Sequence, residues 1–374
     1  MRGRWRAQVI AAFVVIGSFA TACSGGGNPC EVPEEAANPD GVSVGVAFDI
    51  GGIGDKSFND AAKRGFDQAV DEGLISEASC LEPDESGSNR DENLLALADD
   101  GFDLVLGIGF AFSPAVNENA GNYPDQQFAV IDGYATCPPD VCSDIPNPAP
   151  GNVTDLTFEE QEGSFLVGVA AAMQAQKDDC DTVGFLGGQT GFLIGKFEAG
   201  YMNGVAAIDP DMTVLVEYIG DSTAAFNDAV SGENLSTKMY DEGACVIYHA
   251  AGASGAGLFT AAVKADKIAI GVDSDQYELV SDEQKPLVLT SMLKRVDTAV
   301  YDAIGQAGDD SLEGGVGQVF GIAEDGISYS TSNTELMTQD IIDKVEEYKA
   351  QIIDGSLVPS CDPANLDVGC GEEA

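Results

Sequence analysis

Short apolar runs recur along the chain, and longer segments with helical periodicity separate them. The runs are rich in Val, Ile and Leu, which is typical of strands that are covered on both faces of a sheet. We therefore expect buried strands at residues 42–48, 103–108, 127–131, 182–186, 213–218, 245–248, 267–272 and 287–291.

The intervening segments carry apolar residues at helical spacing. In the first of them Phe58, Phe66 and Val70 fall on one face, and Gly73 suits the end of a helix. Similar patterns predict helices at residues 57–72, 158–176, 191–207, 225–240, 294–307 and 334–354. Because strands and helices alternate, we expect an α/β fold built from doubly wound parallel sheets.

The alternating series is interrupted once, by a stretch rich in Pro and Asp at residues 137–151, and a second series begins near Phe158. A chain of this length is long enough for two domains. Two half-chains of the same type therefore predict two similar lobes that face a cleft.

The N-terminus has the pattern of an export signal. Three arginines lie within the first six residues, an apolar run covers residues 9–19, and small residues precede Cys23. Residues 1–22 therefore read as a signal peptide whose apolar run is too short for a lasting membrane span. The position of Cys23 predicts its lipidation and a flexible linker at 23–40, so we expect a lipid-anchored protein on the extracytoplasmic side of the cell membrane. Ordinary secretion with Cys23 in a disulfide is the alternative.

The chain is strongly acidic. Three of its 17 basic residues lie in the signal peptide, which leaves 14 against 63 acidic residues and a formal net charge of −49. Such a field repels phosphate, so we expect no nucleic-acid partner. Self-repulsion of this size is easier to tolerate where salt screens it, and a saline habitat is our hypothesis for the acidic excess.

Eight cysteines follow Cys23, and an even number in an exported chain predicts disulfides. Eight cysteines allow 105 connectivities, so the sequence leaves the pairing open. Two pairs suit local loop staples and two would join the starts of neighbouring strands: Cys137 with Cys142, Cys361 with Cys370, Cys30 with Cys80, and Cys180 with Cys245. There is no CxxC pair and His249 is the only histidine, so we expect no metal site and no cofactor.

Acidic residues and glycines follow several of the expected strands. Asp49, Asp132 and Asp273 each stand at a strand end, beside glycine-containing turns. The carboxyl ends of parallel strands are where ligands bind in such sheets, although a lone acid there is often only a helix cap. Three such positions favour a polar cleft. The glycine-rich loop 49–59 lacks the spacing of a phosphate-binding loop, and its acids would repel an anion.

Six motifs occur in a fixed order: DIGGIGDKSFN, EGSFLVG, VGFLGG, AAGASGAG, GVDSDQ and LTSMLKRVD. Together they resemble the basic membrane protein family of purine nucleoside receptor-like lipoproteins, over roughly residues 42–359. The resemblance implies a type I periplasmic-binding fold with two lobes joined by three crossovers. It also implies a monomer that delivers a nucleoside to the permease of an ABC transporter.

On this basis we expect residues 41–156 plus 286–315 to form the N-terminal lobe and residues 157–285 plus 316–359 to form the C-terminal lobe. Residues 360–374 would then be an acidic, disulfide-bearing tail. This tail and the loop at Cys137–Cys142 are additions to the family pattern, and both could narrow the cleft. Cys245 replaces an Asp that is frequent in the family, which a disulfide to Cys180 would explain.

The resemblance also assigns roles to residues that face the base. Phe58 and Phe226 would stack on its two faces, and base stacking of this kind contributes about 1–3 kcal/mol. Asn59 and Asp132 would bind the base edge. Phe58 taken alone also reads as a core residue on the first helix face.

Further residues are implied for the ribose. Asp49, Asp273 and Lys294 would bind its hydroxyl groups, and hydrogen bonds to charged groups contribute about 1.5–3 kcal/mol each. Gly252 would leave room for the sugar. The alternative for Lys294 is a salt bridge to Asp297 or to an acid of the cleft.

Three other functions fit parts of the pattern. The same fold could bind a sugar or another hydroxylated metabolite, and a sensory lipoprotein could use the same binding chemistry without a transporter. A nucleoside hydrolase would use two of the cleft aspartates as an acid–base pair. Against an enzyme, the sequence has no HExxH motif and no GxSxG match at a strand-to-helix turn, because GVSVG at residues 41–45 falls within an expected strand, and His249 lies in the middle of a strand.

Overall fold

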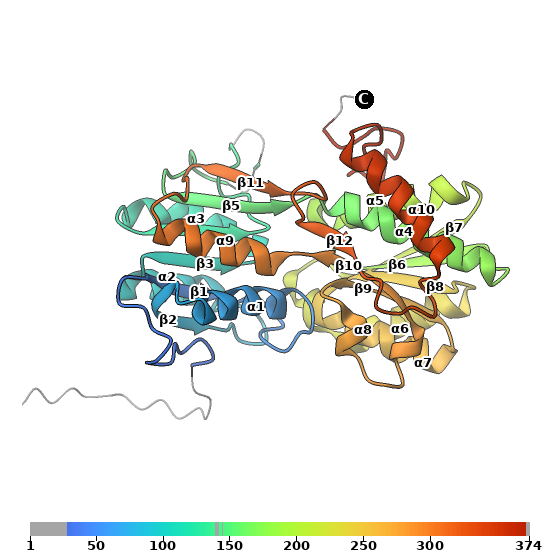
Figure 1. The fold of residues 1–374 in the computed structure, drawn as a ribbon, viewed down its shortest axis with the longest axis horizontal. Helices are drawn as coiled ribbons and strands as arrows, with labels where there is room; N and C mark the ends of the chain where they lie inside the picture. Colours follow the sequence, from blue (N-terminus) through green and yellow to red (C-terminus); the bar gives the residue numbers. More distant parts are fainter. Residues whose placement is uncertain (1–27, 139–141, 144, 372–374) are drawn as a thin grey trace, which may run out of the picture.

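The computed structural model describes residues 28–138, 142–143 and 145–371. The expected signal peptide and Cys23 lie outside these residues. Two six-stranded sheets lie side by side, and helices cover both faces of each (Figure 1). None of the helices in the described ranges combines the length and the apolar character that a membrane crossing requires.

The first sheet has the strand order β11-β5-β4-β3-β1-β2 and is parallel throughout. Its strands are β1 (Val42–Ala47), β2 (Ile75–Leu81), β3 (Leu104–Ile108), β4 (Gln127–Ile131), β5 (Val153–Phe158) and β11 (Val316–Phe320). Its helices are α1 (Phe58–Asp71), α2 (Arg90–Asp100), α3 (Ser113–Asn119) and α9 (Val296–Gly308).

Successive side chains of β1 enter different cores, as strand geometry requires. Val44 and Val46 pack with Phe66 of α1 and Val300 of α9, while Ala47 packs with residues of α2. Both faces are therefore buried, which accounts for the unbroken apolar character of the run.

The second sheet has the order β12-β10-β9-β8-β6-β7, with β12 antiparallel to its neighbour. Its strands are β6 (Thr182–Gln189), β7 (Thr213–Gly220), β8 (Val246–Ala250), β9 (Ile268–Asp273), β10 (Val288–Lys294) and β12 (Ile327–Tyr329). Its helices are α4 (Glu160–Lys177), α5 (Phe192–Ile208), α6 (Ala229–Asp241), α7 (Ala256–Ala265), α8 (Gln276–Leu279) and α10 (Gln339–Ile353). Short 3₁₀ turns lie at Phe110–Phe112, Ala120–Asn122, Thr223–Asn227, Gly252–Gly255 and Lys285–Leu287.

Helices α4 and α5 pack unusually closely because glycines line their interface. A Cβ atom on Gly168, Gly200 or Gly204 would lie 2.0–2.4 Å from a backbone oxygen of the facing helix. Only glycine permits this approach. It fixes the position of α5, whose N-terminal half borders the cleft described below.

Three chain crossovers join the two sheets. They follow β5, β10 and β11, and they are hydrogen-bonded to one another. The amide of Glu159 donates to the carbonyl of Phe320 at 3.1 Å, and the amide of Arg295 donates to the carbonyl of Gly326 at 2.8 Å. The α/β class and the two doubly wound lobes of a type I periplasmic-binding fold are thus as predicted.

The strand pairing differs from the predicted lobe boundaries. Strand β10 lies in the second sheet and β11 lies in the first, so the chain changes sheets after residue 294 and again after residue 320. The prediction placed these exchanges at 286 and 315. An apolar run such as 287–291 is equally well buried in either sheet, so its composition does not show which sheet it joins.

All four predicted disulfide pairings are present, between Cys30 and Cys80, Cys137 and Cys142, Cys180 and Cys245, and Cys361 and Cys370. The third pair joins the starts of β6 and β8, as expected.

The Cys30–Cys80 bridge has a different geometry from the one predicted. Cys80 lies in the edge strand β2, so the bridge ties the segment before β1 to that edge and does not join two strand starts. The side chain of Asn28 strengthens this attachment. It donates to the carbonyl of Ala78 at 3.2 Å and accepts from the amide of Cys30 at 3.0 Å.

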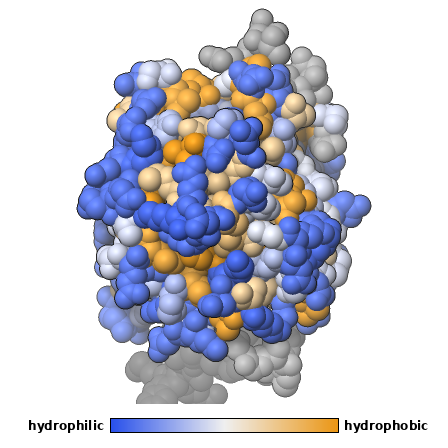
Figure 2. All heavy atoms as spheres, turned by 90° about the vertical axis from the view of Figure 1, so that its right-hand side faces the viewer, coloured by the Kyte–Doolittle hydropathy of each residue, from blue (hydrophilic) through white to orange (hydrophobic). Residues whose placement is uncertain are grey.

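The end of the second lobe that lies away from the first lobe has both apolar and hydrophilic surface. Strand β7 is the edge strand on this side, and its residues are half-buried apart from the exposed Thr213. Figure 2 shows the face, on which apolar patches alternate with hydrophilic residues, some of which cross its middle.

Candidate ligand-binding site

A cavity lies between the two sheets, at the carboxyl ends of strands from both lobes. It contains about 600 Å³ of space that protein atoms do not occupy, part of which is open to solvent. All eight residues predicted to bind the ligand line it: Asp49, Phe58, Asn59, Asp132, Phe226, Gly252, Asp273 and Lys294.

The glycine-rich loop after β1 is held by one carboxylate. Asp55 accepts hydrogen bonds from the backbone amides of Ser57, Asn59 and Asp60 at 2.8–3.1 Å, where α1 begins. The amide group of Asn59 donates to Asp55 at 3.0 Å and accepts from the backbone of Asp49 at 3.2 Å. Asn59 therefore braces the loop at the cavity wall. Burial raises the pKa of Asp55, and these backbone donors oppose the rise.

Asp49 is paired with an arginine that the sequence did not single out. Arg90, the first residue of α2, lies 2.7 Å from Asp49 through Nη2 and donates to it through Nε at 2.8 Å. Burial raises the pKa of Asp49, and Arg90 opposes the rise. Arg90 also donates to the hydroxyl of Thr223 in the other lobe at 3.1 Å. This hydrogen bond joins the two lobes beside Asp49, which lines the cavity.

Asp132 and Asp273 occupy equivalent places in the two lobes, at the ends of β4 and β9. Both have a left-handed backbone, with φ of 58° and 62°. Aspartate tolerates this conformation better than most residues, and it ends each strand in a sharp turn. Burial raises the pKa of each carboxyl to about 6, against the opposing effect of Lys294. Asp273 also accepts a hydrogen bond from the hydroxyl of Ser57 in the first lobe.

Lys294 lines the cavity but already has two carboxylate partners. Its Nζ lies 2.6 Å from Asp132 Oδ1 and 2.9 Å from Glu160 Oε1. Burial alone would lower its pKa, but Asp132, Glu160 and Asp273 hold it above its usual value. The alternative interpretation of Lys294, a salt bridge to an acid of the cleft, is therefore realised, whereas Asp297 pairs with Arg295 at 2.8 Å.

Aromatic rings surround the ammonium group of Lys294. The ring centres of Phe58, Phe158 and Phe197 lie 5.5, 4.9 and 5.4 Å from its Nζ. Such contacts stabilise a desolvated cation. Phe58 thus has a packing role in addition to its place at the cavity.

Phe226 enters from the second lobe in the turn after β7. Its ring packs on the backbone of Gly188, where a Cβ atom would lie 2.4 Å from the ring. On another side Phe226 meets Phe110 of the first lobe edge-on, with ring centres 6.4 Å apart. Phe110 was not predicted as a cleft residue, and its position after β3 is the one signal that could have indicated it. Leu193, Ile194 and Phe197 of α5 were also missed, because their spacing is that of ordinary core residues.

The two lobes are in contact around the cavity. Arg64 donates to the hydroxyl of Ser274 at 3.0 Å, and the side chain of Gln276 donates to the carbonyl of Lys56 at 3.0 Å. Together with the Ser57–Asp273 bond, these contacts join the start of α1 to the turn after β9. The conformation is therefore closed.

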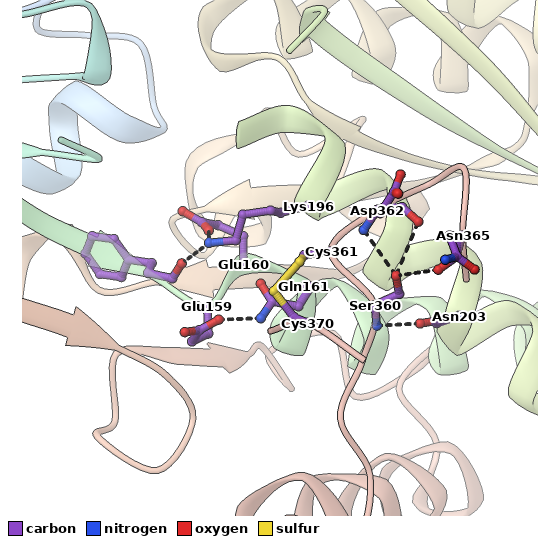
Figure 3. Close-up of a disulfide and its surroundings, with 11 residues drawn as sticks. Glu159, Glu160, Gln161, Lys196, Asn203, Ser360, Cys361, Asp362, Asn365 and Cys370 are labelled. Carbon is purple, nitrogen blue, oxygen red and sulfur yellow. Dashed lines mark hydrogen bonds and ion pairs between the residues drawn. A yellow bond between two sulfur atoms is a disulfide. The ribbon is translucent and has the colours of Figure 1, made fainter. Parts of the chain in front are cut away.

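The cysteine-bearing additions lie outside the cavity wall. In the described part of the chain, no residue of the loop 137–142 or of the tail lines the cavity. The tail packs on α5, where the amide of Ser360 donates to Asn203 at 2.7 Å (Figure 3). Asn203 in turn donates to the carbonyl of Leu366 at 3.0 Å.

The charges of the site suit a neutral ligand that donates hydrogen bonds. Asp49 is balanced by Arg90, and Asp132 and Glu160 are balanced by two lysines. The cation that acts on Asp273 is Lys294, which Asp132 and Glu160 already neutralise. Asp273 therefore offers a carboxylate to the cavity. The described residues include no group of three or more side chains arranged to hold a metal ion.

Comparison with known proteins gives a consistent result. A family model described as "Bmp: ABC transporter substrate-binding protein PnrA-like" matches residues 42–362. The CD4+ T-cell-stimulating antigen of Listeria monocytogenes is 31% identical over 372 residues, covering 96% of this chain and 98% of the relative. The ABC transporter nucleoside-binding protein BmpA of Lactococcus lactis is 31% identical over 335 residues, covering 85% and 89%.

A solved structure has the same architecture. The crystal structure of an ABC transporter solute-binding protein from Aeropyrum pernix matches with a TM-score of 0.71 and 27% sequence identity. The match covers 84% of this chain and 92% of that protein.

Proposed function

The chain belongs to the Bmp family of PnrA-like ABC transporter substrate-binding proteins, and on that premise we propose that it captures a nucleoside, with a purine base, for an ABC importer. The observation that carries the proposal is the cavity, which receives an aromatic ring and a strand-end carboxylate from each lobe. The rings are Phe58 and Phe226, and the carboxylates are Asp132 and Asp273. A nucleoside has a flat base and hydroxyl donors, and it matches both features.

In this proposal Phe226 and Phe58 stack on the base, and Asn59 and Asp132 bind its edge. Because ligand contacts reach both lobes only in the closed form, binding shifts the protein toward closure.

The ribose would lie toward the second lobe. Asp273 accepts hydrogen bonds from its hydroxyl groups, and the left-handed Gly252 beside Phe226 leaves space for the sugar. Asp49 and Lys294 shape the polar wall mainly through the partners that they already hold, Arg90 and the two carboxylates.

The same proposal includes attachment to the membrane through a lipid on Cys23. The cysteine that follows the small residues of the signal sequence supports it. The lipid would hold the binding protein beside its permease.

The direct test is to identify the ligand. Mass spectrometry of molecules released from the purified, denatured protein should find a nucleoside, and calorimetry should give micromolar or tighter binding for purine nucleosides. Free bases and ribose should bind more weakly, because each fills only part of the cavity. Tight binding of a sugar with no nucleoside binding would overturn the proposal. Release of free base from inosine would overturn the assignment as a binding protein.

Replacing Phe226 with alanine should weaken purine nucleoside binding about 5- to 150-fold, which corresponds to the loss of one stacking contact worth about 1–3 kcal/mol. The matched control is Phe192→Ala at the start of α5, because Phe192 is 76% exposed and does not line the cavity. Calorimetry on both variants measures the difference. Equal affinities for the two variants would remove Phe226 from the base-binding site.

A further inference from the structure

A chain of buried charges connects the cavity to the crossovers between the lobes. It consists of Asp132, Lys294, Glu160 and Lys196, in that order, and we call it the crossover network. Lys294 Nζ contacts Asp132 at 2.6 Å and Glu160 at 2.9 Å, and Lys196 Nζ contacts the other oxygen of Glu160 at 2.5 Å. Lys196 also donates to the carbonyl of Phe158.

The members of the network lie where the chain changes lobes. Phe158 is the last residue of β5, and Glu160 is the first residue of α4 beyond that crossover. Lys294 is the last residue of β10, immediately before the second crossover. Lys196 belongs to α5 of the second lobe and points toward Glu160 (Figure 3). The network therefore joins two crossovers to Asp132, which belongs to the first lobe.

Only part of the network touches the cavity. Asp132 and Lys294 line it, whereas Glu160 and Lys196 do not. Exposed side-chain fractions are 1% for Lys294 and Glu160, 5% for Asp132 and 12% for Lys196. Two cations and two anions balance in this space. Removing one of them leaves a buried charge without compensation, which is unfavourable.

We propose that Glu160 and Lys196 are positioning residues that set the charge and orientation of Asp132 at the ligand. Lys196 neutralises one oxygen of Glu160, so that Lys294 is shared between Glu160 and Asp132. Without Lys196, Glu160 competes for Lys294 with its full charge, and Asp132 loses its partner. The inference rests on the proposed function in so far as Asp132 contacts the ligand.

Further groups face Glu160 and enter its titration. Besides Asp132, Lys294 and Lys196, Asp273 at the end of β9 and the phenol of Tyr248 on β8 interact with the network. Burial acts to raise the pKa of Glu160, but Lys196 and Lys294 hold it below its usual value. In the absence of Lys196 a proton enters the network more readily.

The test compares Lys196→Met with the charge-balanced double variant Glu160→Gln/Lys196→Met. The single variant should bind a purine nucleoside at least about tenfold more weakly than the wild type at pH 8, the scale of one hydrogen bond to a charged group. The ratio between the affinities of the wild type and of Lys196→Met should become smaller as the pH falls from 8 to 6. The double variant keeps Lys294 paired with Asp132 alone and should recover to within about threefold of the wild type.

A second readout needs no ligand. Carbon-13 signals of labelled aspartate carboxyls, assigned with Asp132→Asn, give the titration midpoint of Asp132. We expect this midpoint to rise in Lys196→Met and to return in the double variant. An unchanged midpoint in the single variant, or a double variant as impaired as the single one, would overturn the positioning role. If the wild type binds no nucleoside while the midpoint shifts as expected, the proposed function fails and the network stands.

Discussion

Replacing Lys294 with methionine should lower the free energy of unfolding by about 3–5 kcal/mol, the usual cost of removing one partner from a buried ion pair. The variant leaves Asp132 and Glu160 buried with Lys196 as the only remaining cation of the network. Methionine has a similar length, so the packing among Phe58, Phe158 and Phe197 is largely kept. Chemical denaturation at pH 8 measures the loss.

The effect of pH on this variant has a definite sign. Burial already raises the pKa of Asp132 to about 6 in the presence of Lys294, and loss of the lysine raises it further. A carboxyl whose pKa is higher in the folded state binds protons preferentially there, so the folded state gains stability as pH falls. The deficit of Lys294→Met relative to the wild type should therefore be smaller at pH 5 than at pH 8.

The control for this variant is Lys264→Met, which removes a largely exposed lysine paired with Glu233 on the surface. Exposed pairs contribute little, so its unfolding curve should stay close to that of the wild type at both pH values. Equal deficits of Lys294→Met at pH 5 and pH 8 would show that packing, and not charge, accounts for the loss.

Replacing Asp273 with alanine should weaken the binding of purine ribosides about 10- to 150-fold, because a hydrogen bond to a charged group contributes about 1.5–3 kcal/mol. Free bases lack the hydroxyl groups, so their affinity should change far less. Calorimetry with matched riboside and base measures the difference. Equal losses for both would place Asp273 away from the sugar.

The Asp273 carboxylate also accepts a hydrogen bond from Ser57 across the cleft, so the substitution removes an interlobe contact as well. Ser57→Ala removes that contact and keeps the carboxylate. It should weaken ribosides and bases by the same modest factor. Because the pKa of Asp273 is raised to about 6, riboside affinity of the wild type should fall as pH drops below this value. Asp273→Asn should reduce that dependence, and the part that remains should come from Asp132, whose pKa is also raised to about 6.

The site prediction depended more on one general rule than on any single motif: ligands bind at the carboxyl ends of parallel strands. Asp49, Asp132 and Asp273 could be placed at one cleft from sequence, because the carboxyl ends of parallel strands share an edge. The pairing of Lys294 with an acid of the cleft was among the alternatives, but the partner of Asp49 could not be predicted. Arg90 lies on a helix far along the chain from Asp49, as Lys196 does from Glu160, and nothing in the local sequence of either cation indicates which acid it neutralises.

The fold class and the division into two lobes could also be predicted from the sequence. Buried strands such as β1 and β8 can be predicted from their apolar composition, and the resemblance to the family implied two lobes around a cleft. Four strands were missed. Strand β2 is only partly buried and mixes Ser and Glu with apolar residues, and β11 is mostly exposed, so neither carries the signal of a strand covered on both faces. Strand β5 is buried, but Thr and Asp interrupt its apolar residues, and β12 has only three residues.

The attachment of the N-terminal segment to strand β2 has a mechanical consequence. Asn28 and Cys30 are fastened to the first lobe at the sheet edge opposite β11, the edge strand that leads into a crossover. A force that acts through the N-terminus is therefore delivered to the first lobe and bypasses the crossovers. If the proposed lipid on Cys23 holds the protein at the membrane, the first lobe is the one held in place, and any opening of the cleft would move the second lobe relative to it.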